Sequence, residues 1–183
     1  MKLDKAKITI RPEKLSEYEK VNKLIYDAFS EQHGIETGKF MMKHFIEERQ
    51  KDTYIPELSL VAVLEEGLIV GEVALHETNI ITESGEITQL VLAQSAVLPK
   101  YRMQGIMRML VEYALCEAKN MGYGAVFLGG NPRLYARFGF VPSSTYEIYH
   151  KDRQKWGDEG FMVCILKQGV LDGVTGTTSY YGG

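Results

Sequence analysis

The chain is poor in the residues that build disulfide scaffolds and metal centres: two cysteines and four histidines occur among its 183 residues. Cys116 and Cys164 both lie inside apolar stretches, which is typical of small buried side chains in a reducing compartment. The histidines lack the spacing of metal ligands. The sequence therefore predicts neither a disulfide framework nor a metal site.

Long apolar runs are also missing. No stretch approaches the roughly 18 apolar residues that cross a membrane. The N-terminus is charged and leads into no apolar signal segment, so we expect a cytoplasmic protein that is not bound to a membrane. The net charge of -3 argues against nucleic acid as the main partner, because binding phosphate requires a basic face.

The remaining composition is that of a globular protein. Hydrophobic residues make up 45% and charged residues 25% of the chain, which are average proportions. The length suits one domain with its own core, and no repeat or linker interrupts it. Residues 1–183 are predicted to form a single domain. Its tail, 169–183, is rich in Gly, Thr and Ser and is expected to be irregular.

Apolar periodicity in the N-terminal half predicts helices followed by strands. A strand is expected at 8–12, and helices at 16–30 and 38–50. The polar segment 31–36 between these helices contains a glycine and is expected to form a loop. Short turns then separate three predicted strands, which favours an antiparallel meander. These strands are residues 58–64, 69–81 and 87–98.

The C-terminal half begins with a long helical pattern at 104–121, apolar on most faces and therefore buried. A short apolar strand follows at 125–128. With the strand at 87–98 this order forms a βαβ unit, which makes the two strands parallel neighbours. Further elements are expected after them: a short helix at 132–138, a strand near Glu147 and a strand at 161–166.

One functional pattern lies where the buried helix begins. The preceding strand ends in a proline, and the loop contains Arg102 and Gly105. The first amides of a helix have no intrahelical partners, and the helix dipole adds positive charge there. Gly105 would let a phosphate approach the backbone closely. The segment predicts an anion cradle, although an ordinary strand–helix turn shares these features.

A second pattern, Asn131 to Phe140, follows the next strand: Asn-Pro-Arg-Leu-Tyr-Ala-Arg-Phe-Gly-Phe. Together the two patterns resemble the GNAT superfamily of N-acetyltransferases over roughly residues 58–166. The family motif Arg/Gln-x-x-Gly-x-Gly/Ala is matched from Arg102, with Met107 in place of its last small residue. The family pattern Tyr-x-x-x-Gly-Phe is matched from Tyr135. The segment 171–177 further resembles a bacterial branch of predicted N-acetyltransferases.

The resemblance implies a fold and a cosubstrate. The fold is of the α/β (α+β) class: a central mixed, mostly antiparallel sheet with a splayed parallel strand pair and helices on both faces. Acetyl-CoA would insert its pantetheine arm between the splayed strands, and no metal would take part. The cofactor-binding residues that the resemblance implies are Ala96, Val97, Arg102, Met103, Gln104, Gly105, Ile106, Met107, Arg108, Asn131 and Tyr135.

The implied reaction transfers an acetyl group to an amine of a small molecule or peptide by direct attack in a ternary complex. A backbone N–H near Val97 would stabilise the oxyanion, and Tyr135 would protonate the departing thiolate. Glu72 and His76 share one face of their strand and are candidates for the general base, and Glu86 at the start of the next strand is a weaker one. A solvated face is the commoner place for such side chains and is the alternative for each. Gln94 and Ser95 could instead orient the acceptor or water.

The sequence leaves several alternatives open. The domain could bind acyl-CoA for regulation without catalysis, or could transfer a longer acyl group. The acceptor pocket is expected to include the region between the first two helices, and relatives of this kind include homodimers. The residues expected in that region are Phe29, Glu31, Gln32, His33 and Glu36.

Overall fold

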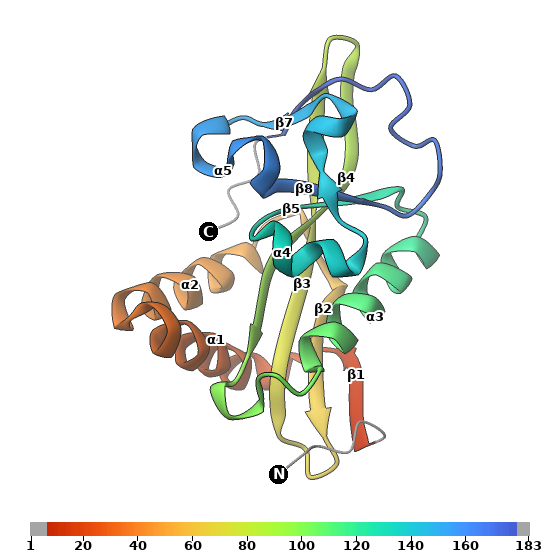
Figure 1. Ribbon diagram of the computed structural model, residues 1–183. Helices are drawn as coiled ribbons and strands as arrows, with labels where there is room; N and C mark the ends of the chain where they lie inside the picture. Colours follow the sequence, from red (N-terminus) through yellow and green to blue (C-terminus); the bar gives the residue numbers. More distant parts are fainter. Residues whose placement is uncertain (1–6, 179–183) are drawn as a thin grey trace. The chain divides into compact units, whose positions relative to one another are not determined.

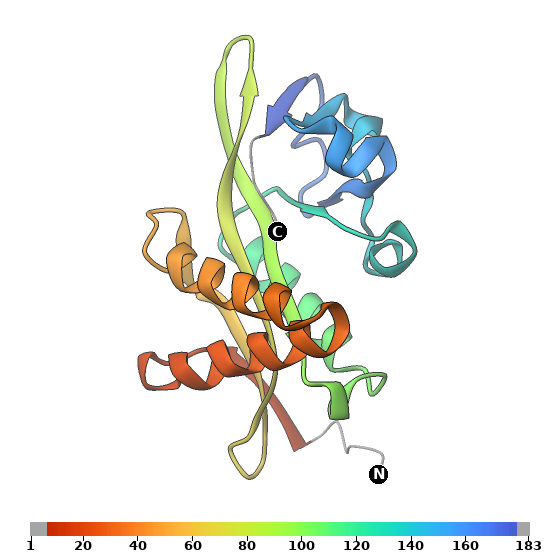
Figure 2. The ribbon, with the colours of Figure 1, turned by 90° about the vertical axis from the view of Figure 1, so that its left-hand side faces the viewer.

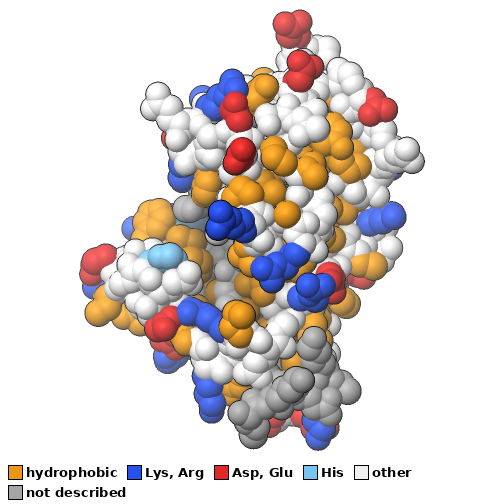
Figure 3. Space-filling model, in the orientation of Figure 1, with side chains coloured by type: hydrophobic (Ala, Val, Ile, Leu, Met, Phe, Trp, Pro, Cys, Tyr) orange, Lys and Arg blue, Asp and Glu red, His pale blue; other side chains and the backbone are white. Residues whose placement is uncertain are grey.

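The computed structural model describes residues 7–178 (Figure 1). These residues fall into two compact units. Of the described residues, 7–75 and 94–114 form unit 1, and 76–93 and 115–178 form unit 2. Within 7–178, no helix has the length and apolar character needed to span a bilayer. Figure 3 shows one face, on which Lys and Arg side chains lie among apolar and acidic ones.

Unit 1 contains the N-terminal strands and helices. Strand β1 (Ile8–Pro12) pairs antiparallel with β2 (Tyr54–Leu64), from Ile8↔Leu64 to Pro12↔Leu60. Strand β3 (Ile69–Thr82) begins in this unit and β4 (Gly85–Val97) ends in it. The helical elements are η2 (Leu15–Glu17), α1 (Tyr18–His33), α2 (Ile35–Glu48), η3 (Pro99–Tyr101) and the first part of α3 (Ile106–Asn120).

Helices cover both faces of the strands in unit 1. On one face, α1 and α2 lie across the strands (Figure 2). On the other, Gly71 of β3 packs so closely on α3 that a Cβ there would lie 3.0 Å from Ile106 and 3.0 Å from Leu110. The apolar residues that α1 and α2 bury against the strands include Val21, Leu24, Ile25, Met41, Phe45, Val61, Val63, Ala74 and Ala96.

Unit 2 contains the C-terminal strands. The first part of β4 pairs parallel with β5 (Ala125–Gly129), and β5 pairs antiparallel with β8 (Phe161–Ile165). Strand β7 (Ile148–His150) runs parallel to β9 (Gly176–Thr178), which pairs antiparallel with β3. The remaining elements are α4 (Pro132–Tyr135), η4 (Ala136–Phe138), β6 (Val141–Pro142), η5 (Ser143–Tyr146) and α5 (Arg153–Gly160).

The strand order by pairing is β1-β2-β3-β4-β5-β8-β6, with β7 and β9 off this path. The predicted fold class is confirmed: the pairing is mostly antiparallel, β4 and β5 are parallel, and helices pack on the strands. The core of unit 2 is apolar and aromatic, with Phe127 and Phe161 stacked at 5.7 Å between ring centres.

Two sequence predictions about local structure were wrong. Residues 31–33 and 35–36 are helical rather than a loop, because one residue, Gly34 at φ 93°, is enough to separate α1 from α2. The tail predicted to be irregular over 169–183 contains β9 at Gly176–Thr178. That strand is stabilised by its pairing with β3 and β7 rather than by its own sequence. Residues 179–183 lie outside the described chain.

Candidate active site

The start of α3, where the anion cradle was predicted, has amides that lack intrahelical acceptors. The first α-helical hydrogen bond that closes there runs from the Met109 N–H to the Gly105 carbonyl, at 3.1 Å. The helix itself therefore offers no acceptor for the amides of Ile106 and Met107, which precede Met109. Gly105 has a φ of 87°, a conformation that side chains with a Cβ rarely adopt. The glycine is required by the turn as well as by close approach of a ligand.

The guanidinium of Arg102 is bonded to the protein. Its Nε donates to the Val97 carbonyl at 3.1 Å, and its Nη2 donates to the Ala28 carbonyl at 2.8 Å. Its Nη1 contacts Glu31 Oε2 at 2.5 Å. Arg102 thus ties the cradle loop to the end of β4 and to the last turns of α1. The guanidinium is therefore engaged within the protein rather than left for a ligand.

The other predicted cradle residues differ in exposure. Ala96, Val97 and Ile106 are buried, whereas Met103 is fully exposed and adopts a φ of 60°. Met107 is half-buried. Two side chains make local contacts: Gln104 Nε2 donates to the Lys100 carbonyl at 3.3 Å, and Arg108 pairs with Glu112 at 3.4 Å.

Glu72 and Gln94, on β3 and β4 of unit 1, are buried polar side chains. They are 1% and 3% exposed, which overturns the solvated-face alternative for Glu72. Within the described residues, neither carboxylate oxygen of Glu72 and neither amide atom of Gln94 has a hydrogen-bond partner. Burial, and then the charge of Glu13, raise the pKa of Glu72 to about 8. Arg49 and the nearby Gln94 amide lower it by less.

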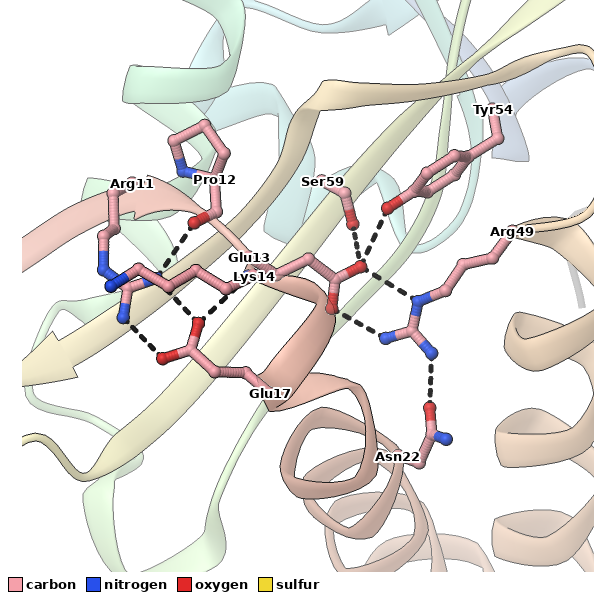
Figure 4. A network of polar contacts seen from close by, with 9 residues as sticks. All are labelled: Arg11, Pro12, Glu13, Lys14, Glu17, Asn22, Arg49, Tyr54 and Ser59. Atoms are coloured by element: carbon pink, nitrogen blue, oxygen red, sulfur yellow. Dashed lines mark hydrogen bonds and ion pairs between the residues drawn. The ribbon is translucent and has the colours of Figure 1, made fainter.

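Glu13 shows the opposite environment in the same unit (Figure 4). Its carboxylate accepts from Arg49 Nε at 2.9 Å and from Arg49 Nη2 at 2.7 Å. The Tyr54 hydroxyl at 2.9 Å and the Ser59 hydroxyl at 2.7 Å complete the set. Arg49 Nη1 also donates to Asn22 Oδ1 at 2.5 Å. This network was not predicted from the sequence, because its members are far apart along the chain.

His76, the second candidate base, lies on the part of β3 that belongs to unit 2 and is 1% exposed. Like Glu72 it does not face solvent. No group of three or more His, Cys, Asp or Glu side chains that could hold a metal occurs within residues 7–178.

Tyr135 in unit 2 is positioned by other residues of the Asn131–Phe140 sequence pattern. Asn131 caps α4, its side chain accepting from the Arg133 N–H at 3.0 Å. The Tyr135 ring meets the Phe140 ring edge-on at 5.9 Å between centres. A Cβ on Gly130 would lie 2.8 Å from the Tyr135 ring, so glycine is needed there. The tyrosine is half-buried and its ring orientation is fixed.

The end of β5 is where the parallel pair separates. The ladder between β4 and β5 comprises Leu90↔Val126 and Val91↔Phe127, although β5 continues to Gly129 and pairs with β8 to that residue. The ring of Trp156, from α5, covers Gly129: a Cβ there would lie 2.4 Å from the indole. Sequence reasoning missed Trp156; the signal available was that it is the single tryptophan.

Known proteins resemble this chain in sequence and in fold. The family model described as an acetyltransferase (GNAT) domain matches residues 9–143. The chain is 38% identical over 127 residues to YhbS of Escherichia coli (strain K12), described as an uncharacterized N-acetyltransferase, across 68% of this chain and 72% of the relative.

Solved structures of GNAT proteins share the fold. YhbS from Escherichia coli in complex with CoA superposes with a TM-score of 0.77 at 27% identity, covering 99% of this chain and 94% of that one. A GNAT family acetyltransferase from Brucella melitensis in complex with acetyl-CoA gives a TM-score of 0.71 at 20% identity, covering 95% and 96%. The second likeness is one of fold alone.

Proposed function

Because the chain belongs to the GNAT acetyltransferase family, we propose that it transfers the acetyl group of acetyl-CoA to an amine of a small molecule or peptide by direct attack. The observation that carries the proposal is the Gly105 turn, where α3 presents amides without intrahelical acceptors. A relative with this fold, Escherichia coli YhbS, binds CoA. We further propose one cytoplasmic catalytic domain.

In this proposal the cradle binds the pyrophosphate of acetyl-CoA through backbone amides from Met103 to Arg108. Arg102 contributes indirectly: its guanidinium positions the loop by donating hydrogen bonds to the carbonyls of Val97 and Ala28. Met107 leaves the amide donors intact, because its backbone is as good a donor as that of glycine. The thioester of acetyl-CoA supplies the activated acyl group.

Tyr135 is the proposed acid. The thiol has a reference pKa near 8.5 and the phenol near 10, so complete proton transfer to the thiolate costs only about 2 kcal/mol, and a phenol within reach can donate the proton as the C–S bond breaks. The edge-on contact with Phe140 and the close contact with Gly130 hold the ring in one orientation. An acid fixed in this way loses little entropy when it acts.

Glu72 is the proposed base. Most amines are protonated at neutral pH and must lose a proton before they attack. A carboxylate is normally too weak a base for this, but burial raises the pKa of Glu72 to about 8. Its carboxylate is buried beside the Gln94 amide, and no ion pair within residues 7–178 neutralises it. His76 is the second candidate, on the grounds of its burial.

The experiment begins with calorimetric titration of acetyl-CoA and of CoA, followed by a screen of amines for release of free thiol. The enzyme binds both ligands and releases CoA only when an acceptor is added. A regulatory acyl-CoA-binding domain would bind without release. A transferase of longer acyl groups would turn over hexanoyl-CoA faster than acetyl-CoA.

Matched variants separate the assigned roles. Tyr135→Phe is expected to lower turnover by roughly 100-fold with unchanged acetyl-CoA affinity. Gly105→Val is expected to weaken acetyl-CoA binding, since valine disfavours the φ of 87° at this turn. Full turnover of Tyr135→Phe would remove the acid role, and full affinity of Gly105→Val would remove the cradle.

A further inference from the structure

We propose that Trp156 is the acceptor-binding wall of this enzyme, and that the acceptor presents to it an ammonium group on an apolar stem. The inference rests on the proposed function and deepens it by naming a residue and a class of acceptor. It is built entirely from residues of unit 2.

The backbone at the end of β5 is covered by two aromatic rings on consecutive residues. A Cβ on Gly129 would lie 2.4 to 2.7 Å from atoms of the Trp156 indole, and a Cβ on Gly130 would lie 2.8 Å from the Tyr135 ring. Real Cβ atoms do not approach other atoms so closely, so both rings rest directly on the main chain. Only glycine at both positions permits this arrangement.

The two rings lie on opposite sides of that backbone. Gly129 ends β5 and pairs with Phe161, and the Gly130 N–H continues this pairing by donating to the Gly160 carbonyl. A Cβ on Gly130 would also lie 3.3 Å from the side chain of Leu128, two positions earlier, so it points to the Leu128 side of the strand. Successive Cβ directions along extended chain point to opposite sides. The Cβ direction of Gly129 meets Trp156 and that of Gly130 meets Tyr135. If Tyr135 protonates the thiolate, CoA occupies the side of Tyr135, and the acceptor approaches from the side of Trp156.

Trp156 is held firmly by the short helix that carries it. The Gly130 N–H donates to the Gly160 carbonyl at 2.9 Å, which fixes the end of α5 to the end of β5. Arg153 binds both oxygens of Asp158, at 2.5 and 2.7 Å. The helix breaks directly after the tryptophan, at Gly157 with φ 63° and ψ -173°. These contacts fix the position of the indole, and the side chain is half-buried, so part of it stays at the surface.

The chemistry of the ring favours a cationic acceptor with an apolar stem. An indole face attracts cations, and amine substrates arrive mostly as ammonium ions. The Nζ of Lys155 already lies 5.2 Å from the centre of the Trp156 ring, so an ammonium group fits this neighbourhood. Trp156 also packs on the apolar core of unit 2, which includes Phe127 and Phe161. An alkyl or aryl stem would therefore contact the exposed part of the indole itself, because Phe127 and Phe161 beneath it are fully buried.

The first test uses Trp156 as its own reporter, because it is the single tryptophan of the chain. Its fluorescence is titrated with butylammonium chloride and, as a neutral control of the same size, with 1-butanol, each with and without saturating CoA. We expect a saturable change with butylammonium and none with butanol in at least one of the two series. No saturable change in either series, or equal changes with both probes, would overturn the proposal.

The second test separates binding from chemistry, using the best acceptor from the amine screen. Trp156→Leu is expected to raise KM for the amine about tenfold, with kcat within about twofold and acetyl-CoA affinity unchanged. Trp156→Phe keeps an aromatic face, so its KM for the amine is expected to lie close to the wild-type value. Lys155→Ala, next to the ring, is the matched control and is expected to leave KM unchanged or lower it.

The outcomes keep the two proposals distinguishable. Thiol release with unchanged KM in Trp156→Leu would overturn the acceptor wall and leave the acetyltransferase intact. Absence of any thiol release would instead count against the proposed function, and the fluorescence titration would still decide whether ammonium ions bind at Trp156. If Trp156→Leu fails to fold, the Trp156→Phe kinetics and the titration remain decisive.

Discussion

Glu13 and Arg49 form a bidentate ion pair in the interior of unit 1, with side chains 1% and 2% exposed. The pair joins the segment between β1 and α1 to the end of α2. Tyr54 and Ser59 donate to the same carboxylate, so its charge is fully surrounded by donors. The net contribution of such a buried ion pair to stability is small. Removing one partner costs more, because the other partner is then left charged, unpaired and shielded from water.

Arg49→Met is therefore expected to destabilise the protein by about 3–5 kcal/mol, as the Glu13 carboxylate loses its counter-ion inside the core. Urea unfolding followed by circular dichroism measures the change. The control is Lys23→Met, which removes an exposed ion pair with Asp27 and is expected to have little effect. A loss in Arg49→Met as small as that in the control would show that the buried pair contributes no more than an exposed one.

Glu72→Gln is expected to change the pH dependence of stability. In the folded protein the pKa of Glu72 is raised to about 8 from a reference value of 4.5. Between these values the folded state binds the proton and the unfolded state does not, so wild-type stability falls as pH rises through this window. Glutamine cannot ionise, so the variant loses less stability over the same range.

The measurement is the melting temperature of both proteins from pH 5 to pH 9. The advantage of Glu72→Gln should grow up to about pH 8 and then level off. Glu57→Gln, at an exposed position of β2, serves as the control and should track the wild type. Parallel curves for wild type and Glu72→Gln would mean that Glu72 is ionised at neutral pH.

Arg102→Leu is expected to weaken acetyl-CoA binding by about tenfold or more, because the cradle loop loses its bonds to Val97 and Ala28. Arg102→Lys should recover only part of the affinity, since an ammonium group cannot reproduce the guanidinium fork. Glu31→Gln removes only the exposed partner and should change little.

Salt dependence identifies how Arg102 acts. A positioning residue leaves the dependence of acetyl-CoA affinity on ionic strength unchanged when it is replaced, whereas loss of a direct phosphate contact makes that dependence shallower. Calorimetry at several salt concentrations on wild type and Arg102→Leu distinguishes the two. A shallower dependence in the variant would assign the guanidinium to the cofactor.

Gly129→Ala is expected to destabilise the protein by about 1–3 kcal/mol, since its Cβ would displace the Trp156 ring. Tryptophan emission should shift at the same time, reporting the displacement directly. Gly160→Ala is the matched control: its Cβ would meet its neighbours at 3.5 and 3.8 Å, which is ordinary contact. Equal effects of the two substitutions would show that the ring does not rest on Gly129.

The elements predicted from the sequence are those whose signal is local. The apolar periodicity around Leu24 and Leu110 is helical, and the apolar run that contains Val126 and Phe127 is a strand, so α1, α3 and β5 could be predicted. The fold class followed from their order. The prediction of a loop at 31–36 was wrong because polar residues such as Gln32 were taken as a sign of a loop. Such residues also extend a helix readily, and α1 continues until Gly34.

The elements and contacts that escaped prediction depend on residues far away in the sequence. β9 is formed by Gly176–Thr178, a segment of three residues that is too short to give a periodic signal. The bonds from Arg102 to Ala28 and Glu31 span more than 70 positions. The sequence motif placed Arg102 in the cradle but could not show which groups its guanidinium contacts. The position of Trp156 likewise could not be predicted, because it depends on the contact of its ring with Gly129.

The pairing of β9 with β3 has a consequence for biosynthesis. Thr78 and Thr178 share a hydrogen bond of 2.9 Å across 100 positions of sequence, and Ile80 pairs with Thr178 in the sheet. Thr78 leaves the ribosome long before Thr178 is synthesised. The part of β3 that pairs with β9 therefore lacks this partner during elongation. This part of β3 can therefore pair with β9 only after residues 176–178 have been synthesised.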